Sequence, residues 1–110
     1  VRSWELRHPE ARWSIGGGID RSALESAMSA DLFARAQRVA RNMGLPEMSS
    51  RAVGGASDGN LTAAAGVPTL DGLGAVGDGA HADHEWASVS GMGERARLLA
   101  GLLSTIGGDA

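Results

Sequence analysis

The feature that most constrains this chain is a glycine-rich run in its second half, VGGASDGNLTAAAGVPTLDGLGAVGDGAHADHE, residues 53–85. Ordering a glycine costs more backbone entropy than ordering any other residue, so such a run is typical of backbone held in special conformations or close to a ligand. The chain has 17 glycines and no cysteine. It therefore has neither a disulfide framework nor a thiolate metal site, and we expect a cytoplasmic protein.

Length and charge exclude several other classes of protein. At 110 residues and 43% apolar content, the chain is long enough for one small globular domain. The net charge is −3, and the ten basic residues are scattered, so we expect no nucleic-acid partner. No run approaches the roughly 18 apolar residues of a membrane span, so we expect no membrane partner. Because the sequence begins at Val1 in what resembles mid-domain sequence, we expect a piece of a longer protein.

Apolar spacing predicts two amphipathic helices and one short helix. The first covers residues 29–43, with Ser29 as its N-cap and Gly44 at its end. The second covers 91–106, with Ser90 as its N-cap and Gly107-Gly108 beyond its end. A short helix is expected over 59–66, capped by Ser57 or Asp58 and ended by Gly66. The arginines opposite the apolar face of the first helix are expected to be solvated; they are Arg35, Arg38 and Arg41.

Extended segments are expected between these helices. The candidates are residues 49–55, 67–74 and 85–89, together with two short pieces between Trp4 and Ile15 that are broken at His8-Pro9. Strands that alternate with helices indicate an α/β layer structure.

The segment GGASDGN, residues 54–60, leaves a predicted strand and opens a predicted helix. Backbone amides at such a helix start attract anions, and Ser57 and Asn60 add side-chain hydrogen-bonding groups. The segment suits a carboxylate or a carbonyl; it lacks the Lys-Ser/Thr pair of a phosphate loop. A tight turn with an N-cap explains the same residues without a ligand.

Two further features are candidates for chemistry. In GDGAHADHE, residues 77–85, His81 is a candidate metal ligand or general base, although HEXXH spacing is missing. A solvated polar loop is the alternative, and a small metal-sensing loop is another; its residues would be His81, Asp83, His84 and Glu85. Arg21 follows three glycines, and arginine is the usual bidentate partner of a carboxylate, although it is equally explained as a surface charge.

Taken in this order, these stretches resemble the carboxy-terminal part of a zinc-dependent exopeptidase family. The family includes glutamate carboxypeptidase, acetylornithine deacetylase, succinyl-diaminopimelate desuccinylase and aminoacylase. The likeness runs from about Ile15 to Ile106, and its most specific block is residues 54–85. It implies part of a three-layer αβα catalytic domain over residues 19–110. Residues 1–18 would then be the end of an α+β lid domain, including its terminal strand.

The resemblance also implies roles for single residues. His81 falls on the histidine that closes a two-zinc site, so this chain would supply one zinc ligand. Arg21 falls on the arginine that holds the substrate carboxylate, but Asp20-Arg21-Ser22-Ala23 stands where the family has Asn-Arg-Pro-Pro. The loop lining the carboxylate end of the pocket is matched by Gly55, Ser57, Asp58 and Asn60. Glu85 matches the acidic residue that ends the histidine loop, and His84 stands where aspartate is more common.

The function implied is hydrolysis of the amide bond next to a free-carboxylate amino acid, in an N-acyl amino acid or a peptide. The family's other zinc ligands and its general base lie upstream, so this piece would be inactive without its amino-terminal part. The lid would mediate a homodimer. The alternative is a non-catalytic carboxylate-binding or structural module that retains the fold.

Overall fold

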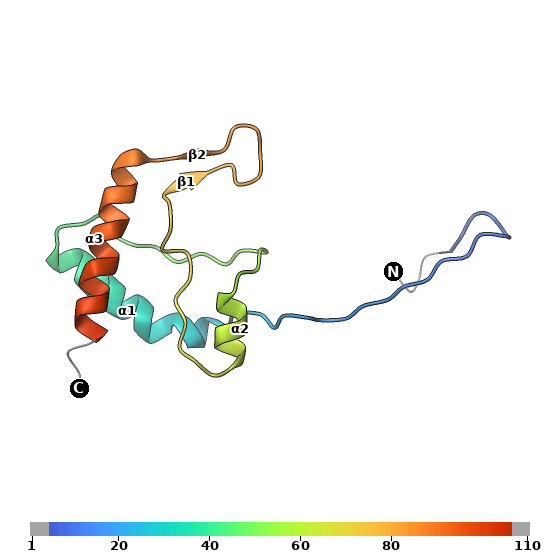
Figure 1. Cartoon of the computed structure of the whole chain (residues 1–110), viewed down its shortest axis with the longest axis horizontal. Coiled ribbons are helices and arrows are strands. Elements are labelled where there is room, and N and C mark those ends of the chain that lie inside the picture. The colour runs from blue at the N-terminus through green and yellow to red at the C-terminus, as the bar shows by residue number, and fades with distance from the viewer. Residues whose placement is uncertain (1–4, 107–110) are drawn as a thin grey trace.

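The computed structural model describes residues 5–106 and is mostly helical (Figure 1). Its elements are α1 (Ser26–Asn42), α2 (Gly59–Ala64), β1 (Gly77–Asp78), β2 (Trp86–Ala87) and α3 (Val89–Ile106). Residues 5–25 contain no helix or strand, and the amino-terminal part of this segment extends away from the helices (Figure 1). The strands expected between Leu6 and Ile15 are therefore absent, while Trp4 and Gly107-Gly108 lie outside the described residues.

The ends of α1 and α2 confirm the positions predicted from their glycines. After α1, Gly44 has φ 65°, and the amide of Leu45 donates to the carbonyl of Ala40 at 2.9 Å. After α2, Gly66 has φ 83°, and the amide of Val67 donates to the carbonyl of Thr62 at 3.1 Å. Both ends are Schellman motifs, in which a left-handed residue lets the chain satisfy the last helical carbonyls.

The starts of the two long helices differ from the prediction. α1 begins at Ser26, three residues before Ser29, and its flanking residue Glu25 makes no side-chain capping bond. α3 begins at Val89, so Ser90 lies inside the helix. The cap is Ser88, whose Oγ accepts a hydrogen bond from the amide of Gly91 at 3.1 Å. Because two serines lie within reach of this start, the helical pattern alone does not distinguish them.

The small core lies where α1 crosses α3 (Figure 1). Val39, Ala40 and Leu98 are buried there, and the half-buried residues packed against them are Met43, Leu45, Met48 and Leu73. The crossing is close at Gly101, where an added Cβ would lie 2.7 Å from Val39 Cγ1. Arg35, expected to be solvated, instead donates through Nη1 to the carbonyl of Thr105 at 2.9 Å. It therefore links α1 to α3.

The strands predicted over 49–55 and 67–74 are wrong, because both segments run without a ladder partner. An extended segment counts as a strand only when a neighbour pairs with its backbone groups. The observed sheet is one antiparallel hairpin, in which Gly77 pairs with Ala87 and Asp78 with Trp86. β2 lies within the extended segment predicted over 85–89. The part of the chain that the structure describes thus forms helices and one hairpin, not a complete αβα sandwich.

A second face of α3 has apolar side chains that this arrangement leaves exposed. They are Val89, Met92, Leu99, Leu103 and Ile106. In a layered domain such a face would pack on a sheet. None of the helices within residues 5–106 combines the length and apolar character needed to cross a membrane.

Candidate functional site

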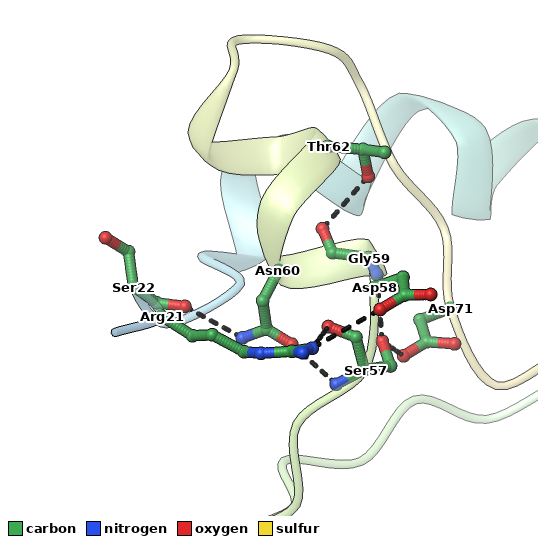
Figure 2. A network of polar contacts seen from close by, with 8 residues as sticks. All are labelled: Arg21, Ser22, Ser57, Asp58, Gly59, Asn60, Thr62 and Asp71. Carbon is green, nitrogen blue, oxygen red and sulfur yellow. Dashed lines mark hydrogen bonds and ion pairs between the residues drawn. The ribbon is translucent and has the colours of Figure 1, made fainter. Parts of the chain in front are cut away.

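The side chain of Arg21 reaches the start of α2 across 36 positions of sequence (Figure 2). Its Nη1 donates to the carbonyl oxygen of Ser57 at 3.0 Å and lies 3.4 Å from Asp58 Oδ1. The side chain of Asp58 is 94% exposed, so this ion pair is worth at most about 1 kcal/mol. The structure therefore brings together three of the predicted site residues, with the Ser57 carbonyl as the better-placed partner of Arg21.

The side chain of Asn60 also connects the segment around Arg21 to the loop around Ser57 (Figure 2). Its Oδ1 accepts a hydrogen bond from the amide of Ser57 at 2.9 Å. Its Nδ2 donates to the carbonyl of Ser22 at 2.8 Å. A single side chain thus holds the residue after Arg21 against the loop that Arg21 contacts.

The hydroxyl of Ser57 makes two hydrogen bonds, one as acceptor and one as donor. It accepts from the amide of Gly59 at 3.0 Å and donates to Asp71 Oδ2 at 2.5 Å (Figure 2). Of the two N-caps predicted for α2, Ser57 supplies the side-chain oxygen, and Asp58 makes no capping bond. The predicted helix start is confirmed, with its first amides partly satisfied by the serine.

Asp71 belongs to this cluster although sequence reasoning did not single it out. Its Oδ1 accepts from the amide of Gly72 at 2.7 Å. The hydrogen bond from the Ser57 hydroxyl, followed by that from Gly72, lowers the pKa of Asp71 below its ordinary value of 3.8. The available signal was an Asp-Gly pair, which is typical of a turn in which the aspartate bonds to nearby backbone.

The segment that carries Asp71 is itself tied to the helices. The amide of Thr69 donates to the carbonyl of Met28 in α1 at 2.9 Å. The hydroxyls of Thr69 and Thr62 lie 2.8 Å apart, which joins the segment to α2. Asp71 is therefore presented to Ser57 by a segment with fixed contacts on two helices.

Gly55 is exposed, and an added Cβ there would meet nothing within 4 Å. The same holds for Gly54. Neither residue has positive φ, so neither packing nor a turn requires glycine at these positions. Arg21, Ser57, Asp58, Asn60 and Asp71 form what we call the Arg21 cluster. It lies at the surface, since the side chains of Arg21 and Asp58 are 37% and 94% exposed. Two surface hollows lie elsewhere: one of about 400 Å³ along α1, and one of about 260 Å³ between α3 and residues 45–48.

His81 lies between β1 and β2, in the turn at the tip of the hairpin. It is exposed, and its φ of 67° is in the left-handed region that non-glycine residues rarely adopt. Within residues 5–106, no hydrogen bond or ion pair joins this hairpin to the Arg21 cluster. Figure 1 shows the hairpin and α2 on opposite sides of the segment that leads from α1 to α2.

The metal-sensing loop considered for this turn is not formed. Among the residues that the structure describes, no three histidine, aspartate or glutamate side chains are placed to hold a metal ion. The imidazole of His84 instead lies over the turn, where an added Cβ on Gly79 would be 2.9 Å from His84 Cδ2. His81 therefore offers a single exposed imidazole.

The chemistry available at the cluster is recognition of an anion. Both contacts of Arg21 use Nη1, so Nε and Nη2 have no hydrogen-bond partner within the described part of the chain. These two nitrogens form the edge of the guanidinium that matches the two oxygens of a carboxylate. The contacts on Nη1 restrict the orientation of that edge.

Comparison with known proteins gives one result. The sequence pattern of peptidase family M20/M25/M40 matches residues 14–105, which include Arg21, the loop of residues 54–60 and His81. No curated protein and no solved structure matches the chain.

Proposed function

The chain belongs to peptidase family M20/M25/M40, and from this premise we propose that its Arg21 cluster binds the free carboxylate of the substrate in a zinc-dependent exopeptidase or amidohydrolase. The substrate would be an N-acyl amino acid or a peptide, cut at the amide bond next to the carboxylate-bearing residue. The family consists of metallo-exopeptidases that are generally zinc-dependent, which gives the proposal its reaction class.

The observation that carries this proposal is the contact between Arg21 and the Ser57 carbonyl. It joins a candidate carboxylate ligand to the loop predicted to line the pocket, and Asn60 reinforces the junction. A carboxylate on Nε and Nη2 would gain two charge-assisted hydrogen bonds, and a ligand could approach the exposed Gly55, where an added Cβ would meet nothing within 4 Å. Binding one end of the substrate in this way fixes the position of its scissile bond.

We further propose that His81 supplies one zinc ligand. One imidazole cannot hold the ion, so the remaining ligands would come from beyond the described residues, as would the general base. The exposed position and left-handed backbone of His81 fit this role, because strained backbone gathers at ligand-binding positions. When bound, zinc would polarise the amide carbonyl and lower the pKa of a bound water.

Two observations favour a second function, a non-catalytic carboxylate-binding module. Residues 5–106 gather the Arg21 cluster but no group of metal ligands. Asp20-Arg21-Ser22-Ala23 also lacks the two prolines that flank the family's arginine. This module would bind N-acyl amino acids without hydrolysing them.

Zinc content and hydrolysis distinguish the two functions. The protein expressed from its natural coding sequence would be tested on N-acetyl amino acids and on dipeptides ending in glutamate. The peptidase proposal predicts hydrolysis, bound zinc and loss of both in His81→Ala, with His8→Ala as the matched control. A protein that binds no zinc and hydrolyses none of these compounds would contradict it.

A further inference from the structure

Every polar group of Ser57 makes a hydrogen bond (Figure 2). Its amide donates to Asn60, and its carbonyl accepts from Arg21. Its hydroxyl accepts from Gly59 and donates to Asp71. A serine with all groups engaged is poorly suited to bind substrate directly and well suited to hold other residues in place.

The contact with Asp71 fixes the direction of this network. A hydroxyl has one hydrogen, and the amide of Gly59 already points at the oxygen, so Ser57 must donate to Asp71. The short 2.5 Å contact is typical of a hydroxyl bound to an ionised carboxylate. The second oxygen of Asp71 is held by the Gly72 amide, which keeps the carboxylate from rotating away.

We infer that Asp71 is a positioning residue for carboxylate recognition: it holds Ser57, and through the Ser57 carbonyl it sets the direction of the Arg21 guanidinium. The path is continuous, from Asp71 Oδ2 to Ser57 Oγ and from Ser57 O to Arg21 Nη1. This inference rests on the proposed function of Arg21. Asp71 lies 50 positions after Arg21 in the sequence, and no hydrogen bond or ion pair joins the two side chains.

The test is the preference of the protein for a free acid over its neutral C-terminal amide, measured as a ratio of kcat/KM. The probes are the N-acetyl amino acid that is hydrolysed best and the corresponding N-acetyl amino acid amide. Because only the acid needs a correctly aimed Arg21, we expect Asp71→Ala to lower this ratio about tenfold. A purely structural defect would slow both probes alike. Asp31→Ala, an exposed aspartate of α1, is the control.

The route through Ser57 has its own test. Ser57→Ala should lower the ratio as much as Asp71→Ala, and the double variant should be no worse than either, because both substitutions remove the same Ser57–Asp71 hydrogen bond. Asp71→Asn should fall between, since Ser57 and Gly72 are bound by different oxygens of Asp71, and in asparagine one of these two positions becomes an NH2 group that cannot accept. Unchanged zinc content would show that each variant is folded.

Two results would overturn the inference, and they can be told apart. If Arg21→Ala leaves the ratio unchanged, the proposed carboxylate site fails and the role of Asp71 fails with it. If Arg21→Ala lowers the ratio while Asp71→Ala and Ser57→Ala do not, the carboxylate site stands and Asp71 has no part in it. Additive effects in the double variant would also contradict the path through Ser57.

Discussion

Arg21 and Ser57 lie 36 positions apart in sequence, and a 3.0 Å hydrogen bond joins the guanidinium of one to the backbone carbonyl of the other. The serine side chain takes no direct part in this contact, because its hydroxyl donates to Asp71 instead. Its strength therefore depends on how well the loop holds its shape. The hydroxyl of Ser57 thus holds the loop in place, and its carbonyl orients the guanidinium of Arg21.

The titration of Asp71 should report the Ser57 contact directly. In the wild type the pKa of Asp71 lies below 3.8, and in Ser57→Ala it should rise toward that value because the principal cause is lost. Since the folded-state pKa is the lower one, the contribution to stability is complete above about pH 4 and disappears as pH falls through the folded pKa. Carboxyl chemical shifts followed by NMR would measure both values, and equal titration curves would contradict the contact.

Two glycines of α3 should respond to alanine in opposite ways. At Gly101 a Cβ would lie 2.7 Å from Val39 Cγ1 and 2.8 Å from Met43 Sδ, so Gly101→Ala should destabilise the protein by about 1–3 kcal/mol. At Gly93 a Cβ would meet nothing within 4 Å, so Gly93→Ala should stabilise it by about 0.5–1 kcal/mol through helix propensity. Urea denaturation measures both. Effects of the same sign would show that α1 and α3 do not cross at Gly101.

Two leucines of α3 test which face packs on α1. Leu98 is 2% exposed and Leu103 is 67% exposed. Leu98→Ala should cost about 2–5 kcal/mol of unfolding free energy through lost burial and a cavity, whereas Leu103→Ala should change it by about 0.5 kcal/mol or less. Comparable losses in both variants would mean that the outer face of α3 is covered in solution.

Local signals in the sequence predicted the helices, and the family resemblance predicted much of the candidate cluster. Gly44 and Gly66 end their helices because each needs a backbone conformation that glycine adopts at little cost. Arg21, Ser57, Asp58 and Asn60 were expected to serve one site, and the structure places them in contact. Their role in binding substrate, like that of Gly55, stays a prediction.

The strands were mispredicted because a strand depends on its partners. Residues 67–74 contain the apolar residues Val67, Leu70 and Leu73, but within the described chain no strand forms a ladder with their backbone. The position of Asp71 was missed for a related reason. Its partner Ser57 lies 14 positions away, and only the turn after α2 brings the two together. Such contacts depend on how segments that are distant in sequence pack against one another, which apolar periodicity does not describe.

Recognition of a free carboxylate by Arg21 is measured by the acid-to-amide ratio of kcat/KM in wild type, Arg21→Ala and Arg21→Lys. We expect the ratio to fall roughly tenfold or more in Arg21→Ala. We expect only partial recovery in Arg21→Lys, because lysine keeps the charge but not the two-nitrogen edge. Arg38→Ala, at an exposed position of α1, should leave the ratio unchanged. If the Arg21→Ala protein still prefers the acid as strongly as the wild type does, Arg21 does not recognise the carboxylate.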